Sequence, residues 1–193
     1  MTNDKMYSEK KIKDYLKELA SREPVPGGGS AAALVGATGV ACLTKVVNFT
    51  LGNEKYKNVE ALMEGYLERL EKFQRVFQKL CSDDALVYGE LSEAFKMPKN
   101  EERAGKIQKA LKEAMDVPLE ICKVSHEAMA LCAPLGEKGN KNLISDVDCA
   151  VQMLKCAYQA ALLNVEINLK SIRDEKFVGE TKKTLESMKG KME

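Results

Sequence analysis

Apolar residues recur along most of this chain at intervals of three and four positions, the spacing that places them on one face of an α-helix. The first such set lies between charged residues and consists of Ile12, Tyr15, Leu16 and Leu19. No stretch alternates apolar and polar residues for long enough to indicate a β-strand. The pattern therefore predicts an all-α fold, a helical bundle of about six helices.

The same spacing predicts five further helices. In chain order they cover residues 30–51, 59–95, a region that begins near 101, 145–172, and 176–193, which frays at its end. Gly52-Asn53 is expected to end the second helix. Pro118 is expected to break or kink the fourth, because proline cannot donate to the helix ladder. A loop is expected from Pro134 to Asn140.

A chain of 193 residues is most simply one domain, here 1–193, with room for a real core. The helices predicted over 30–51 and 145–172 are apolar around most of their circumference. A single small bundle covers such helices poorly, whereas a two-fold symmetric interface between copies would bury them. We therefore expect a homodimer.

Charge is nearly balanced, with 30 Lys and Arg against 29 Asp and Glu. This balance argues against a nucleic-acid partner held by bulk charge. Residues 24–44 carry no charge but are rich in Gly, Ala, Ser and Thr, so a buried helix explains them better than a membrane span. Met1 is followed by Thr-Asn-Asp-Lys rather than by a signal peptide, so we expect a cytoplasmic protein without a membrane partner.

The cysteines form no C-x-x-C pair and are read as reduced thiols in a helical core. They are Cys42, Cys81, Cys122, Cys132, Cys149 and Cys156. His126 is the only histidine, and no set of residues has the spacing of zinc ligands, so no metal is expected.

The segment from Pro24 to Ala33 is the most distinctive in the chain. Pro24 and Pro26 hold the approach extended, and Gly27-Gly28-Gly29 allow the backbone to come close to a ligand. Ser30 has the chemistry of an N-cap, so a helix N-terminus would face a negative or polarised oxygen. A tight corner between helices is the alternative, and the pattern is not that of a nucleotide loop.

Two acids interrupt the apolar pattern elsewhere. Asp84 follows Asp83 and precedes Tyr88 within the third predicted helix, where a solvated face is the ordinary explanation. Asp146 lies in the segment 140–146, which begins with Asn140 and opens the fifth helix. There Ser145 or Asp146 is expected to cap the helix.

Polar side chains also gather at two further places. Lys45 and Asn48 share one side of the second helix, and Lys55-Tyr56 follow its end. Asn164 and Asn168 are four residues apart on an otherwise apolar helix, so they share one face. Buried amides need partners, which a polar ligand or a second subunit would supply.

Together these segments resemble the cyclodeaminase/cyclohydrolase family of folate enzymes over almost the full chain. The matching segments are Pro24-x-Pro26-Gly27-Gly28-Gly29-Ser30-Ala31-Ala32, Asn48-Phe49-Thr50-Leu51-Gly52-x-x-Lys55-Tyr56, Asp84-x-x-x-Tyr88, Lys106-Ile107-Gln108-x-Ala110-Leu111, Asp116-Val117-Pro118-Leu119, Lys138-Gly139-Asn140-x-Asn142-x-Ile144-Ser145-Asp146 and Asn164-Val165-x-x-Asn168. The second and fifth segments look closer to stand-alone methenyltetrahydrofolate cyclohydrolases than to the cyclodeaminase half of the bifunctional formiminotransferase enzyme. In one departure, Val147-Asp148 stand where the family commonly has Ala-Gly.

The resemblance implies an all-helical dimer that binds a tetrahydrofolate derivative as substrate and uses neither cofactor nor metal. The activity it implies is hydrolysis of 5,10-methenyltetrahydrofolate to 10-formyltetrahydrofolate. One alternative is a formiminotetrahydrofolate cyclodeaminase that releases ammonia. The other is a non-catalytic folate-binding or scaffold dimer, which the Val147-Asp148 departure would favour.

For the reaction we expect Asp84 or Asp146 to move protons from a partly desolvated position. Lys55, with Lys45 in reserve, would pair with folate carboxylates, and Lys55 is the third candidate catalytic residue beside the two acids. The substrate-binding residues implied by the matched segments are Pro26, Gly27, Gly28, Gly29, Ser30, Lys45, Asn48, Tyr56, Asn140, Ser145, Asn164 and Asn168.

Overall fold

A computed structural model describes residues 7–192. Its α-helices are α1 (Ile12–Leu19), α2 (Gly28–Asn48), α3 (Glu60–Lys96), α4 (Glu101–Lys138), α5 (Ile144–Leu169) and α6 (Glu175–Met192). Short 3-10 turns are η1 (Tyr7–Glu9), η2 (Glu54–Val59) and η3 (Lys141–Leu143). Residues 7–192 contain no strand, so the predicted all-α fold of about six helices is confirmed. Met1–Lys5 and Glu193, which carried the expectations about a leader and a frayed end, lie outside the described residues.

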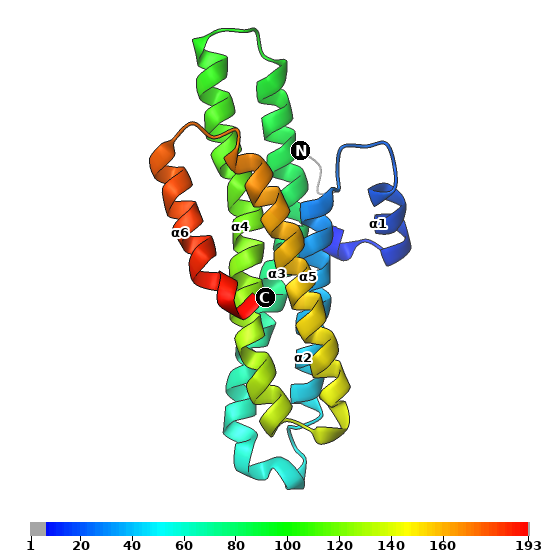
Figure 1. The fold of residues 1–193 in the computed structure, drawn as a ribbon. Helices are drawn as coiled ribbons and strands as arrows, with labels where there is room; N and C mark the ends of the chain where they lie inside the picture. Colours follow the sequence, from blue (N-terminus) through cyan, green and yellow to red (C-terminus); the bar gives the residue numbers. More distant parts are fainter. Residues whose placement is uncertain (1–6, 193) are drawn as a thin grey trace.

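Helices α2 to α5 form an elongated bundle (Figure 1). The α3–α4 hairpin extends beyond the other helices at one end, and α6 lies along α4. Helix α1 stands away from the bundle and buries one residue, Tyr15. The bundle thus leaves the N-terminus of α2 between α1, α3 and α5.

Helix α2 lies at the centre and packs against α3, α4 and α5. Its small residues let the neighbouring helices come close. A Cβ added at Gly36 would lie 2.6 Å from Cζ of Phe77, a fully buried ring of α3. Phe77 therefore occupies the space that a side chain at position 36 would need.

By length and composition alone, α2 is apolar enough to cross a membrane. In the bundle, 56% of its apolar window is buried against other helices. Burial of this kind is what a central bundle helix needs, because an apolar surface on every side must be covered.

Helix α4 contradicts two expectations. It runs from Glu101 to Lys138 without a break at Pro118 and continues through Pro134. Each proline removes one hydrogen bond of the ladder. Pro118 and the residues on either side of it are buried, and this packing outweighs the local loss. The link to α5 shrinks to Gly139-Asn140 and η3.

The expected caps are also different. Gly27, not Ser30, is the N-cap of α2, and Leu143 precedes α5 without a side-chain cap. Asn140 instead connects the loop before α5 to the residues that follow α2. Its backbone N–H donates to Thr50 Oγ1 at 2.9 Å, and its Nδ2 donates to the Phe49 carbonyl at 2.9 Å.

The six cysteines are free thiols, but they do not all lie in the core. Cys81, Cys122 and Cys132 are buried, whereas Cys149 and Cys156 are exposed on α5. These two are spaced by two helical turns and so share one outer face of that helix.

Candidate functional site

The N-terminus of α2 meets a carboxylate from α3. The Ser30 backbone N–H donates to Asp84 Oδ2 at 3.0 Å. A Cβ added at Gly29 would lie 2.8 Å from Asp84 Cγ, so only glycine leaves room for this carboxylate. The Asp84 carboxylate therefore lies at the helix N-terminus, where the sequence predicts an oxygen of a bound ligand.

A cavity of about 280 Å³ opens at this point. Its walls come from the glycine turn and from α3, α4 and α5: Pro24, Val25, Gly27, Gly28, Gly29, Asp84, Val87, Tyr88, Leu91, Ala114, Pro118, Asn164 and Asn168. It brings together residues from four of the segments on which the family resemblance rests. Pro26 and Ser30 do not line it, and the Ser30 side chain is fully buried behind it.

Asp84 is partly buried, and the cavity lining holds no Lys or Arg. Burial raises the pKa of Asp84 above its ordinary value, and the hydrogen bond from the Ser30 N–H opposes that rise. No residue of the described chain accepts from the N–H groups of Gly28 and Gly29, which begin the helix. The site thus offers a carboxyl group of raised pKa beside two available donors.

The two asparagines line the cavity from α5. Asn164 donates from Nδ2 to the Ala160 carbonyl at 2.9 Å and stands next to Gly28. The side chain of Asn168 makes no hydrogen bond within residues 7–192. Both side chains line the cavity, where their remaining donors and acceptors are available to a polar ligand.

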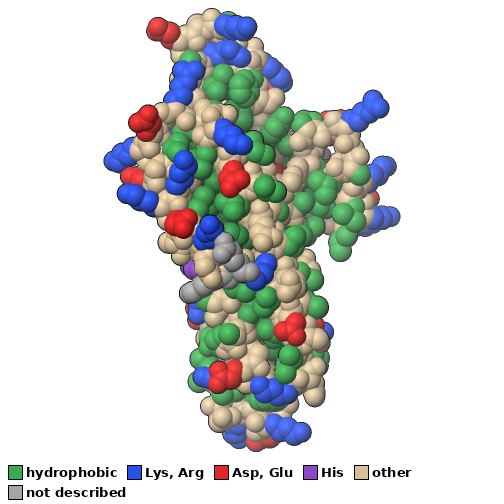
Figure 2. Space-filling view, in the orientation of Figure 1, with side chains coloured by type: hydrophobic (Ala, Val, Ile, Leu, Met, Phe, Trp, Pro, Cys, Tyr) green, Lys and Arg blue, Asp and Glu red, His purple; other side chains and the backbone are tan. Residues whose placement is uncertain are grey.

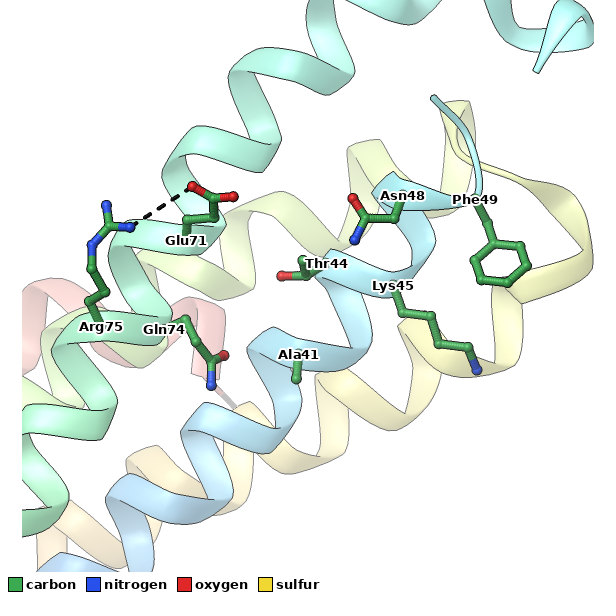
Figure 3. A pocket seen from close by; sticks show the side chains of 8 residues that line it. All are labelled: Ala41, Thr44, Lys45, Asn48, Phe49, Glu71, Gln74 and Arg75. Carbon is green, nitrogen blue, oxygen red and sulfur yellow. Dashed lines mark ion pairs between the residues drawn. The ribbon is translucent and has the colours of Figure 1, made fainter. Parts of the chain in front are cut away.

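A second group of predicted residues lies at the other end of α2. Lys45 Nζ and Asp146 Oδ1 form an ion pair of 2.9 Å between α2 and α5. The hydrogen bond that Lys45 donates to the Asp146 carboxylate raises the pKa of Lys45. Asn48 lies one turn beyond Lys45. It lines a second cavity of about 460 Å³ that Figure 3 shows between α2 and α3, with Ala41, Thr44, Lys45, Phe49, Glu71, Gln74 and Arg75.

The remaining predicted residues lie near that lower end but are spread along the loops. Tyr56 accepts at its hydroxyl from the Lys141 N–H at 2.9 Å, so it supports the loop before α5. Lys55 and Ser145 are exposed. Asn140 is buried and holds the end of α2, as described above.

Within one chain the structure does not bring the two groups together. Helix α2 has 21 residues, which at the rise of an α-helix makes it roughly 30 Å long. Asp84 contacts its first turn and Asp146 its last turns. Asp84, the glycine turn, Asn164 and Asn168 form one site, and Lys45, Asn48 and Asp146 form another.

Several site residues were not singled out from the sequence. Val87 and Leu91 look like ordinary apolar positions of a helix. Ala114 is typical of a helix, and Pro118 is typical of a helix break. Tyr88 had a usable signal, because it stands one turn after Asp84 and shares its face. Among residues 7–192, no group of three or more His, Cys, Asp or Glu side chains is placed to hold a metal ion.

The Val147-Asp148 departure does not reach the Asp84 cavity. Val147 is buried, with a methyl group 3.9 Å from the position of a Cβ at Gly136 of α4. Asp148 is exposed. The departure therefore changes the packing of α5 on α4 and the outer surface of α5.

Comparison with known proteins covers nearly the whole chain. Residues 11–187 match the family model described as formiminotransferase-cyclodeaminase. The chain is 40% identical to the methenyltetrahydrofolate cyclohydrolase of Methylorubrum extorquens, over 95% of this chain and 90% of that protein. It is 29% identical to the formimidoyltransferase-cyclodeaminase of Mus musculus, over 92% of this chain and 34% of that protein.

A solved structure agrees with these matches. The formiminotetrahydrofolate cyclodeaminase of Thermotoga maritima has a TM-score of 0.89 with this chain at 33% identity, over 95% of this chain and 90% of that one. The resemblance inferred from the conserved order of the glycine, acid and asparagine segments is thereby confirmed. The chain belongs to the formiminotransferase-cyclodeaminase family.

Proposed function

We propose that this chain is a methenyltetrahydrofolate cyclohydrolase that converts 5,10-methenyltetrahydrofolate and water to 10-formyltetrahydrofolate. The observation that carries the proposal is a partly buried carboxyl group, Asp84, held at a helix N-terminus inside a cavity. The 40% identity to a cyclohydrolase over nearly the full length of both proteins supports it. The substrate is a soluble metabolite, and we propose a cytoplasmic enzyme.

In this reaction, water attacks the carbon that bridges N5 and N10. Asp84 takes one proton from the water as the C–O bond forms. It returns that proton to N5 as the C–N5 bond breaks, and the remaining hydroxyl proton leaves to solvent. The raised pKa of Asp84 suits both steps, because proton transfer is most efficient when the pKa of the group approaches the working pH.

The other cavity residues would bind and orient the pterin. The N–H groups of Gly28 and Gly29 suit a carbonyl oxygen, and the helix dipole adds to their pull. Asn164 and Asn168 can pair with the amide edge of the ring, which presents both donors and acceptors. Because both reacting partners are held together, much of the barrier is removed by positioning.

We also propose that the enzyme is a homodimer whose site is shared between subunits. A cavity of about 280 Å³ is below the usual range of small-molecule sites, on the order of 300–1,000 Å³. An antiparallel pairing of the α2–α5 faces would bring Lys45, Asn48 and Asp146 of the second copy to the glycine turn of the first. Lys45, with Lys55 nearby, would then meet the folate carboxylates.

The surface of α5 is consistent with such an interface. Leu163 and Ile167 are 62% and 63% exposed, and Cys149 and Cys156 continue the same helix toward its N-terminus. Hydrophobic side chains are also visible on this side of the molecule in Figure 2. An apolar face of this extent is most simply covered by another protein surface.

A second candidate is the cyclodeaminase reaction, in which 5-formiminotetrahydrofolate closes to the methenyl compound and releases ammonia. It is favoured by the TM-score of 0.89 to a formiminotetrahydrofolate cyclodeaminase. The same groups would serve, since both reactions pass through a tetrahedral carbon between two nitrogens. A non-catalytic folate-binding dimer is the remaining alternative, and within one chain Val147-Asp148 do not line the Asp84 cavity.

One experiment separates the three. The purified protein is given methenyltetrahydrofolate and formiminotetrahydrofolate in separate assays, and methenyl absorbance and ammonia are followed. Loss of absorbance in the first assay supports the cyclohydrolase, and ammonia with rising absorbance in the second supports the cyclodeaminase. Folate binding without turnover in either assay would overturn both catalytic proposals.

A further inference from the structure

Ser30 joins three elements behind the cavity wall. Its hydroxyl lies 2.7 Å from the Cys81 carbonyl of α3 and 3.2 Å from the Tyr15 hydroxyl of α1. Its backbone N–H donates to Asp84. Ser30 therefore connects α1, the start of α2 and a single turn of α3.

The directions of these bonds follow from the inventory of donors. A carbonyl can only accept, so the single Ser30 hydroxyl proton goes to Cys81. The Ser30 oxygen must then accept from Tyr15, whose hydroxyl is the donor. Tyr15 is 3% exposed and Ser30 is fully buried, so water does not replace either bond.

These contacts fix Ser30 at two points. Cys81 and Asp84 are three residues apart on α3, and Ser30 touches the first through its side chain and the second through its backbone. A shift of the side chain would therefore change the direction in which its N–H points. A hydrogen bond weakens steeply as that angle falls away from linear.

We propose that Tyr15 is a positioning residue for Asp84, because its hydroxyl holds Ser30 in the orientation from which the Ser30 N–H binds the Asp84 carboxylate. The inference rests on the proposed function, in which Asp84 transfers the proton. Tyr15 touches neither the cavity nor the substrate, so it acts only through Ser30.

The surroundings of Asp84 make this effect measurable. The titratable groups that face it are Tyr7 on η1, Tyr15 on α1, and Cys81 and Tyr88 on its own helix; α2, α4 and α5 present no charged group to the cavity. Burial raises the pKa of Tyr7 and Cys81 and raises that of Tyr15 to about 12. These three groups stay neutral in the acid range, so none of them changes its charge while Asp84 titrates.

The test compares Tyr15→Phe with Tyr7→Phe. Both remove one phenol hydroxyl from the same edge-to-face pair, whose ring centroids are 5.7 Å apart, but only Tyr15 bonds to Ser30. Loss of the Tyr15 hydroxyl loosens the bond that lowers the pKa of Asp84. We expect the acid limb of kcat/KM to move to higher pH, with kcat/KM on that limb about three- to tenfold lower. Plateau kcat stays near the parent value.

A second readout needs no turnover. The Asp84 carboxyl carbon is titrated by NMR, with Asp84→Asn used for assignment. We expect a higher midpoint in Tyr15→Phe and in Ser30→Ala, and the parent midpoint in Tyr7→Phe. Unchanged midpoints in folded Tyr15→Phe and Ser30→Ala, or an equal shift in Tyr7→Phe, would overturn the proposal. If the parent lacks turnover, the proposed function fails while this titration still decides the inference.

Discussion

Gly29 and Asp84 form a complementary pair, because the Asp84 carboxylate occupies the space that a side chain at position 29 would need. A Cβ at position 29 would come within 2.8 Å of Asp84 Cγ. The glycine run is thus explained as much by an acid of the same chain as by a ligand. The glycine run permits the Asp84 carboxylate to reach a helix N-terminus, where the backbone N–H of Ser30 donates a hydrogen bond to it.

The first prediction concerns this pair. Gly29→Ala forces Asp84 or the α2 backbone to move, and overpacking of this kind costs about 1–3 kcal/mol. We expect a lower melting temperature and a large loss of turnover. Thermal denaturation and the absorbance assay check both.

Two variants serve as controls for Gly29→Ala. At Gly28 an added Cβ would lie 3.7 Å from Asn164, an ordinary contact, so Gly28→Ala should keep its stability. Gly65 is exposed with nothing within 4 Å, so Gly65→Ala should keep both stability and activity. Equal behaviour of Gly29→Ala and Gly65→Ala would contradict the steric argument.

The second prediction assigns the proton transfer. Asp84→Asn keeps the size of the side chain and its acceptor oxygen but removes the titrating group. General acid–base catalysis contributes roughly a hundred- to ten-thousandfold, so turnover should fall by at least about a hundredfold with folate still bound. Asp83 pairs with Lys79 on the outer face, and Asp83→Asn should cost little. Parent-like turnover of Asp84→Asn would move the proton transfer elsewhere.

The third prediction concerns stability and pH. Because burial raises the pKa of folded Asp84 above 3.8, its ordinary value, ionising it costs stability at higher pH. Asp84→Asn should therefore melt at a higher temperature than the parent at pH 7. The difference should shrink as pH falls through the raised pKa and vanish below 3.8. A parent that melts at the higher temperature at pH 7 would contradict the dominance of desolvation.

The fourth prediction tests the subunit interface. Leu163→Glu places a charge on the outer face of α5 and should convert the proposed dimer to a monomer with little turnover. Sedimentation at micromolar concentration and thiol labelling of Cys149 and Cys156 measure this. Phe95, 51% exposed at the hairpin end, provides the control Phe95→Glu, which should remain dimeric. A parent that sediments as a monomer would rule the shared site out.

The fifth prediction tests whether the two groups of residues meet across that interface. Asp84→Asn and Asp146→Asn should each be nearly inactive alone. Mixed subunits form dimers with one intact shared site, so re-equilibrated equal mixtures should recover about a quarter of parent activity. No recovery, in mixtures shown to exchange subunits, would mean that Asp84 and Asp146 do not act in one shared site.

The Lys45–Asp146 pair provides a check on that experiment. Its side chains are 50% and 22% exposed, so solvent screens the pair and its contribution to the stability of the fold is small. Any large effect of Asp146→Asn must therefore arise from the reaction and not from the fold.

The helices themselves could be predicted from the order of apolar residues, because periodic burial dominates helix formation in a bundle. Ile12–Leu19 agrees with the predicted first helix, and α3 lies within one residue of the expected 59–95 at both ends. The glycine run, Asp84 and the two asparagines likewise stand out in the sequence as candidate site positions. Their residue types are unusual on apolar faces, so each stands out without knowledge of its neighbours.

What the tertiary structure decided was which of these positions meet. Asp84 and Gly29 are far apart in sequence, and only the packing of α3 on α2 places the carboxylate against the glycine. Pro118 is buried within an unbroken α4, and α2 begins after Gly27 rather than at Ser30. Local propensity acts over a few residues, whereas the choice among partners depends on contacts between helices. The contacts between helices therefore separate the predicted site residues into two groups, at opposite ends of α2.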